Sequence, residues 1–207
     1  MARLKLYTTM ASPFGRKARM GAIICGLDDR IDVVAIDLAN PPPEFLELTP
    51  LGKVPTLVDA DGTPIYDSRV ILSWMDREAG GDLILPRDPT ARMEALRLQA
   101  LADGIVDAGV LQVYEHRYRP EEMRSAMWLE RQEAKIRRGL AQLEAAKLRF
   151  QGGPPHVGEI ALAALLGFSD SHFAGAWRPD YPGLYAWLDS FAAAVPAWER
   201  TRVKPVS

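Results

Sequence analysis

The sequence predicts an α/β domain followed by an all-α helical bundle. In the first third of the chain, short runs of strand-forming residues alternate with helical patterns. Residues 80–89 then hold two glycines and two prolines, which is typical of a linker. Beyond this segment the pattern is helical only. We therefore expect one domain at residues 1–79 and another at residues 90–207, joined by the linker.

The first domain opens with a strand and a helix. Residues 4–7 alternate apolar and polar side chains, which indicates a half-buried strand. Ser12 is a favoured N-cap and Pro13 a favoured first helical residue, so a helix is expected to begin here. Gly26 is expected to end it, since glycine is common just after a helix.

Four side chains of this helix need an interpretation. Arg16, Lys17 and Arg19 are taken as a solvated face, although Arg16 or Lys17 is a candidate to meet an anionic ligand. Cys25, the only cysteine, lies among apolar residues at helical spacing and is expected to be a buried structural thiol. One cysteine excludes an internal disulfide and is typical of a reducing compartment.

A strand, a short helix and a hairpin complete the first domain. Residues 31–36 are rich in Val and Ile, and residues 44–48 look helical after a proline-rich loop. Strands at 56–59 and 63–66 flank the Asp-Gly turn signal at 61–62, and a further helix follows. The resulting order, β-α-β-α-β-β-α, is that of a thioredoxin-like domain.

The second domain is expected to be a bundle of about five helices. The predicted ranges are residues 90–118, 121–150, 159–173, 183–194 and 196–200. The third of these helices is apolar on all sides and should therefore lie at the centre of the bundle. The residues from Thr201 onward are expected to form a loose tail.

Composition excludes several classes of partner. The 207 residues are 48% hydrophobic, which is enough for a proper core, and the net charge of −2 argues against nucleic acid or an anionic membrane. We find no apolar run of about 18 residues and no signal-peptide pattern, so a cytoplasmic location is expected. His116, His156 and His172 lack metal-ligand spacing, so no metal is expected.

Two features between residues 51 and 75 suit a bound ligand. Pro55 cannot donate to a sheet ladder, so Val54 should approach the sheet edge with its own N–H and C=O open to an extended peptide. Asp67 and Ser68 open a helix, whose free N–H groups and positive end favour a carboxylate. The same residues also fit a plain hairpin that leads into a helix.

The K-V-P-x-L run at residues 53–57, the hairpin and the pair Asp67-Ser68 together resemble the glutathione site of the glutathione transferase family. Most members carry Glu-Ser or Gln-Ser where this chain has Asp67-Ser68. The two-domain plan extends the resemblance over nearly the whole chain. It implies that glutathione is the co-substrate, that Lys53, Val54, Pro55, Asp67 and Ser68 bind it, and that the Val54–Pro55 bond is cis.

Ser12 is the candidate catalytic residue. Residues 12–15 occupy the place of the Cys-x-x-Cys motif of a thioredoxin, and the lack of both sulfurs excludes dithiol exchange there. The Ser-Pro-Phe run resembles serine-type bacterial transferases, which implies that Ser12 donates a hydrogen bond to the glutathione thiolate, with Phe14 in the same site. A plain N-cap role is the alternative for Ser12. The rival hydroxyls near this position are those of Tyr7, Thr8 and Thr9.

Asp103 and Asp107 lie one helical turn apart, on either side of Gly104. Like charges at this spacing destabilise an exposed helix slightly, so the pair hints at close packing and a positive partner, with a solvated face as the alternative. The resemblance implies that an acidic residue here reaches across a dimer interface to the amino group of glutathione, and Asp103 is the closer match.

One position departs from the family pattern. Members usually begin the buried helix with Ser or Thr three residues before an Asp, a capping box, whereas this chain has His156 and Glu159. Histidine is a poor cap, so we expect a weaker start to this helix and the same fold. A set of ring-bearing residues could line a substrate pocket or belong to the core: Tyr114, His116, Tyr118, Trp128 and Trp177.

The resemblance implies a homodimeric glutathione S-transferase that conjugates the glutathione thiolate to a hydrophobic electrophile, as in detoxification. Two alternatives stay open. One is a non-catalytic member of the same fold that binds glutathione or a protein partner. The other is a glutathione-dependent peroxidase, which needs no protein cysteine. The electrophile cannot be identified from the sequence.

Overall fold

The structure is a computed structural model that describes residues 3–203. The first part of the chain contains β1 (Leu4–Thr8), α1 (Pro13–Ile24), η1 (Asp28–Arg30), β2 (Ile31–Ala35), α2 (Pro43–Leu48), β3 (Thr56–Val58), β4 (Pro64–Ile65) and α3 (Ser68–Glu78). Apart from the short 3-10 turn η1, this is the predicted thioredoxin-like order of strands and helices, which is thereby confirmed.

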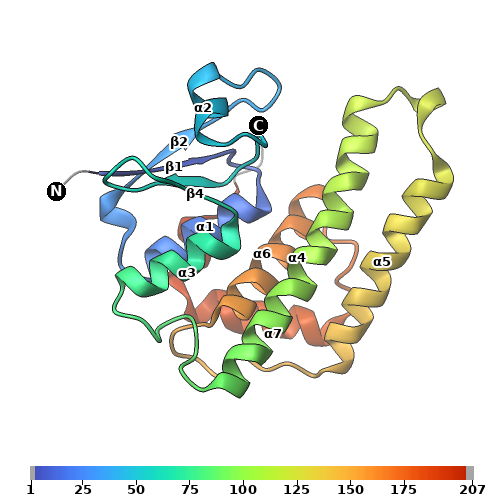
Figure 1. The fold of residues 1–207 in the computed structure, drawn as a ribbon. Helices are drawn as coiled ribbons and strands as arrows, with labels where there is room; N and C mark the ends of the chain where they lie inside the picture. The colour runs from blue at the N-terminus through green and yellow to red at the C-terminus, as the bar shows by residue number, and fades with distance from the viewer. Residues whose placement is uncertain (1–2, 204–207) are drawn as a thin grey trace.

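The four strands form one mixed sheet with the order β2-β1-β3-β4. β1 pairs parallel to β2 and antiparallel to β3, so that Tyr7 lies opposite Thr56. Leu4 and Leu6 of β1 point into the core on the face covered by α1 and α3, whereas α2 lies on the other face (Figure 1). The contact between the rings of Tyr7 and Phe45 joins β1 to α2 on that second face. The sheet thus carries α1 with its N-terminus directed toward the helical part of the molecule.

The rest of the chain is helical, as predicted. It contains α4 (Pro89–Tyr118), η2 (Glu121–Met123), α5 (Ala126–Ala145), α6 (Val157–His172), α7 (Pro182–Ala194) and α8 (Pro196–Arg200). α4 and α5 run side by side as a long pair, and α6 lies between α4 and α1 (Figure 1). Nearly every side chain of α6 is buried, which confirms the expected central helix. None of the helices in residues 3–203 has the length and apolarity needed to span a membrane.

The structure corrects the predicted start of α5 and the expected loose tail. α5 begins at Ala126 because the Ser125 hydroxyl accepts a hydrogen bond from the Trp128 N–H and caps the helix there. Thr201 is buried, and its carbonyl accepts a hydrogen bond of 2.8 Å from Arg19. Residues 204–207 of the expected tail lie outside the described residues.

The predicted weak start of α6 is also wrong. The His156 Nδ1 accepts hydrogen bonds from the N–H groups of Gly158 and Glu159, at 3.1 and 3.3 Å. In return the Glu159 carboxylate accepts a bond of 3.0 Å from the His156 N–H, which completes a capping box. The Nδ1 of His156 therefore accepts the N–H bonds that a Ser or Thr hydroxyl accepts in the usual capping box.

The three cations of α1 are buried, contrary to the predicted solvated face. Arg16 stacks on Trp198 at 3.8 Å and donates to the Trp198 carbonyl at 3.0 Å. Burial lowers the pKa of Arg16 to about 10, with nearby Arg19 as the second cause. Cys25 is buried as expected, and burial raises the pKa of its thiol to about 12. These contacts join α1 of the first domain to α8 of the second.

Candidate functional site

Two adjoining cavities lie where the first domain meets the helical domain. The larger has a volume of about 920 Å³ and the smaller about 240 Å³. They share four lining residues: Phe14, Lys53, Val54 and Asp107. Ser12 lines the larger cavity, and Pro55, Asp67, Ser68 and Asp103 line the smaller. The residues selected from the sequence therefore all border one of two connected spaces.

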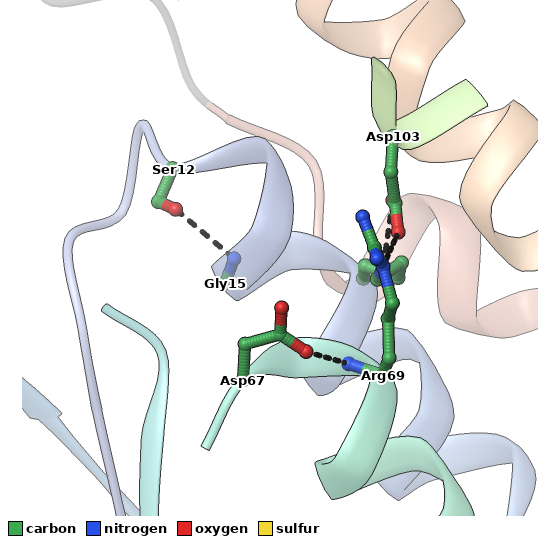
Figure 2. A network of polar contacts seen from close by, with 6 residues as sticks. Ser12, Gly15, Asp67, Arg69 and Asp103 are labelled. Atoms are coloured by element: carbon green, nitrogen blue, oxygen red, sulfur yellow. Dashed lines mark hydrogen bonds and ion pairs between the residues drawn. The ribbon is translucent and has the colours of Figure 1, made fainter. Parts of the chain in front are cut away.

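Ser12 is the N-cap of α1 at the edge of the larger cavity (Figure 2). Its Oγ accepts a hydrogen bond of 3.0 Å from the Gly15 N–H. A serine hydroxyl has one proton to donate in addition to its acceptor lone pairs, so this cap leaves the donor unused. The plain N-cap role and a donor role toward a ligand are therefore compatible in the same side chain.

The rival hydroxyls differ in their access to the cavity. Thr8 is fully buried and donates to the Thr9 carbonyl at 3.0 Å, so its proton is already used. Tyr7 packs on Phe45 at the other face of the sheet and lines neither cavity. Thr9 does line the larger cavity. Ser12 and Thr9 are thus the hydroxyl side chains of this loop that border the cavity.

The loop before β3 contributes open backbone groups. The Val54–Pro55 bond is cis, as the resemblance implied, and β3 begins only at Thr56. The Thr56 hydroxyl donates to the Lys53 carbonyl at 3.1 Å and holds the loop in place. No hydrogen bond joins the N–H or C=O of Val54 to another residue in the range 3–203. Both groups are therefore available to a ligand in the shared part of the two cavities.

Asp67 and Ser68 open α3 at the smaller cavity. The Asp67 carboxylate caps the helix by accepting a bond of 2.9 Å from the Arg69 N–H (Figure 2). Ser68 is the first helical residue and is only 3% exposed. The start of a helix carries N–H groups without helical partners and a partial positive charge. A carboxylate placed in the smaller cavity would meet both.

Asp103 of α4 is held by two cations of its own chain. Lys17 Nζ lies 2.7 and 2.8 Å from the two carboxylate oxygens, and Arg69 Nε lies 2.9 Å from Oδ2. The Asp103 and Lys17 side chains are 2% and 1% exposed, whereas that of Arg69 is 49% exposed. Burial lowers the pKa of Lys17, although Asp103 opposes the shift. The positive partner hinted at by the sequence is present at Asp103, whereas Asp107, the other member of the pair, is exposed.

These two ion pairs bear on the cross-subunit role expected for Asp103. A carboxylate with this little exposure and two partners in its own chain is not free to reach across a dimer interface. Asp107, one turn further along α4, borders both cavities. Burial raises the pKa of its carboxyl, and the charge of Asp103 adds to the shift. Of the two acidic residues of α4, Asp107 is therefore the more open to a ligand, although the sequence favoured Asp103.

The aromatic and histidine candidates fall into two groups, those that line the larger cavity and those that do not. Tyr114 and Tyr118 line the larger cavity together with Arg117, Phe168 and His172. Trp128 borders a second hollow beside α5, which shares Tyr114 and Tyr118 with the larger cavity. Trp177 is buried and donates to Asp170 at 2.9 Å. His116 lines neither of the two cavities. The helical period could have indicated Arg117 beside the two tyrosines, but Phe168 and His172 come from the distant helix α6.

Metal ligands do not gather in the described part of the chain. Within residues 3–203, no three side chains of His, Cys, Asp or Glu lie close enough together to hold a metal ion.

The chain matches two family models. Residues 11–78 match the glutathione S-transferase N-terminal domain, and residues 126–190 match the C-terminal domain. Among curated proteins, it is 32% identical to the uncharacterized GST-like protein YibF of Escherichia coli (strain K12), over 90% of this chain and 93% of that protein.

Solved structures agree with this match. A glutathione transferase family member from Pseudomonas fluorescens Pf-5, with bound glutathione, has a TM-score of 0.88 and 38% identity, over 98% of this chain and 100% of that one. A glutathione S-transferase from Methylobacillus flagellatus KT, also with glutathione bound, has a TM-score of 0.88 and 31% identity, over 97% of this chain and 100% of that one.

Proposed function

Because the chain belongs to the glutathione S-transferase family, we propose that it conjugates the thiolate of glutathione to a hydrophobic electrophile. The observation that carries this proposal is the pair of connected cavities. The wall of the smaller cavity includes charged and hydroxyl side chains and a helix N-terminus, which suit a charged tripeptide. The larger has mainly apolar and aromatic walls, which suit a hydrophobic second substrate, and Ser12 stands at its edge.

In this proposal glutathione spans the smaller cavity as an added strand. Its backbone pairs with the N–H and C=O of Val54, and β3 begins only after Pro55, which has no N–H to donate to the sheet ladder. Its γ-glutamyl carboxylate lies at the start of α3, beside Ser68 and the Asp67 cap. Lys53, in the shared wall, offers a cation to a carboxylate of the tripeptide, and Phe14 packs against its apolar part.

Ser12 is the proposed catalytic residue. Its hydroxyl donates to the glutathione sulfur while its Oγ keeps the Gly15 N–H, and the positive end of α1 adds to the effect. Both interactions favour the thiolate over the thiol. The thiolate then attacks the electrophilic carbon, a C–S bond forms, and the leaving group departs with its bonding electrons. The proton released by the thiol passes to solvent.

In this proposal Asp103 supports the site indirectly, through the two cations that it binds. It holds Lys17 and Arg69, and the pair with Arg69 fixes the first turn of α3 against α4. The homodimer remains part of the proposal. In this homodimer Asp103 does not contact the glutathione amino group across the subunit interface, because its carboxylate is buried within its own chain.

The test is a panel of electrophiles with glutathione: 1-chloro-2,4-dinitrobenzene, phenethyl isothiocyanate and cumene hydroperoxide. The proposal expects a conjugate with one of the first two, identified by its mass and formed faster than without protein. Turnover of the hydroperoxide alone would favour the peroxidase alternative. Binding of glutathione by calorimetry with no turnover of any compound would favour a non-catalytic binding protein.

A further inference from the structure

The end of the larger cavity away from the smaller one has flat aromatic walls. Tyr114 and Tyr118 lie one turn apart on α4 and meet edge-on, with ring centres 5.3 Å apart. On α6, the rings of Phe168 and His172 lie 4.4 Å apart at an angle of 34°. Aromatic rings contribute large apolar faces to such walls, so a flat aromatic molecule suits this space.

Arg117 brings a cation to the same end. It lies between the two tyrosines in sequence, and its guanidinium is 5.6 Å from the centre of the Tyr118 ring. No ion pair joins Arg117 to a carboxylate anywhere in residues 3–203, whereas Arg119, two residues on, pairs with Glu115. The cavity therefore ends in a guanidinium whose charge has no direct counter-ion.

The other charged groups that line the cavity form no ion pair with Arg117 within residues 3–203. Lys53 and Asp107 belong to the wall shared with the smaller cavity, and Asp107 lies roughly 15 Å along α4 from Arg117 at 1.5 Å per residue. The Asp37 carboxylate accepts bonds of 2.9 and 3.3 Å from Ala39 and Asn40 in its own loop. These bonds lower the pKa of Asp37, and the charge of Arg117 adds to the shift, so Asp37 lies within electrostatic reach of the guanidinium. Within residues 3–203 no ion pair or hydrogen bond joins the two side chains, so the donors of Arg117 stay open to another acceptor.

The two phenols add neutral donors beside the guanidinium. Neither the Tyr114 nor the Tyr118 hydroxyl forms a hydrogen bond with another residue of the described range 3–203. The Arg117 guanidinium and the hydroxyls of Tyr114 and Tyr118 are thus donors on the wall of one cavity, and carboxylates are the acceptors that arginine binds best.

We infer that the preferred electrophile is a flat aromatic compound that carries a carboxylate or similar anionic group, which Arg117 binds with help from Tyr114 and Tyr118. The inference rests on the proposed function and names its substrate class. The ring lies between the aromatic walls, its anionic group faces Arg117, and its reactive carbon faces the thiolate. In an aryl chloride the C–S bond forms, the C–Cl bond breaks, and chloride leaves.

Two finished conjugates test the inference without turnover. They are S-(2,6-dinitrophenyl)glutathione and S-(4-carboxy-2,6-dinitrophenyl)glutathione, which differ only in the carboxylate. Calorimetry on the full chain should show the carboxylated conjugate binding about tenfold tighter, as expected for a hydrogen bond to a charged group. Arg117→Gln should remove this preference and change the affinity for the conjugate without the aryl carboxylate by no more than about twofold. Arg117→Lys should keep part of the preference.

Arg138→Gln is the matched control, because Arg138 is exposed on α5 and lines neither cavity. Equal binding of the two conjugates by the parent, or a preference that survives Arg117→Gln, would overturn the inference. So would a failure of both conjugates to bind.

Turnover then separates the inference from the proposed function. 2-Chloro-1,3-dinitrobenzene and 4-chloro-3,5-dinitrobenzoate are compared by kcat/KM, each divided by its uncatalysed rate constant. The benzoate should be favoured by about tenfold in the parent and lose this advantage in Arg117→Gln. If the conjugates show the preference but neither chloride is turned over, the proposed conjugation fails while the anion-binding inference stands.

Discussion

A single hydroxyl can cap a helix and still serve a ligand. Ser12 uses its oxygen to accept the Gly15 N–H and keeps its proton free. Gly15 makes the arrangement possible, because a Cβ at this position would collide with the Thr8 hydroxyl. The local sequence around Ser12 therefore serves both the helix start and the proposed site.

Ser68 gives the first prediction at this scale. Ser68→Ala should weaken glutathione binding by about 1.5–3 kcal/mol, since it removes a proposed hydrogen bond to a charged carboxylate. Calorimetry measures the change. Ser73→Ala is the control, because Ser73 is an exposed serine of the same helix. If both variants bind glutathione like the parent, the carboxylate lies elsewhere.

The two cations on Asp103 give the second prediction. Lys17→Met leaves a buried carboxylate with one partner fewer and should cost about 3–5 kcal/mol of unfolding free energy. Arg69→Met should cost about 1 kcal/mol or less, because the Arg69 side chain is half exposed. Denaturant unfolding measures both. Equal losses would mean that burial does not set the strength of these pairs.

At the scale of elements, the order of strands and helices followed from local patterns, because N-caps, glycines and the alternation of apolar residues act over a few positions. The burial of Arg16, Lys17 and Arg19 did not follow. Their partners include Asp103, Trp198 and Thr201, which lie 86 to 185 residues away along the chain. No local pattern distinguishes such cations from a solvated face.

The residues that line the cavities show the same contrast between local patterns and contacts with distant parts of the chain. Asp67, Ser68 and the Val54–Pro55 pair could be selected in advance, since each is marked by its own neighbours. Phe168 and His172 could not, because only the packing of α6 against α1 and α4 brings them to the cavity. The division into residues 1–79 and 90–207 stays a prediction.

The helix α6 gives a prediction of its own. His156→Ala should lower the free energy of unfolding by about 1 kcal/mol, the usual loss when an N-cap side chain is removed. His156→Ser should restore most of it, since a hydroxyl can accept the same N–H bonds. Urea unfolding compares the three proteins. An alanine variant as stable as the parent would show that the imidazole cap contributes nothing.

For the whole molecule, we predict a homodimer. Large apolar side chains are exposed on α3 and α4, among them Val70, Met93 and Leu96, and a symmetric partner would cover them. Sedimentation at low micromolar concentration should give about twice the chain mass of 22.9 kDa. Val70→Glu should shift the protein toward the monomer if α3 belongs to the interface. A parent that sediments as a monomer contradicts the prediction.

The central claim is that the protein holds glutathione as a thiolate beside Ser12. The direct measurement is the ultraviolet absorbance of the thiolate, titrated with pH on bound glutathione. A free thiol has a pKa near ~8.5, and a hydroxyl donor plus a helix N-terminus should lower it by roughly one to two units. Ser12→Ala should return the pKa most of the way with little loss of affinity, whereas Thr9→Val and Tyr7→Phe should titrate like the parent. A parent complex that titrates like free glutathione, or a pKa that moves in Thr9→Val and stays in Ser12→Ala, would contradict the account.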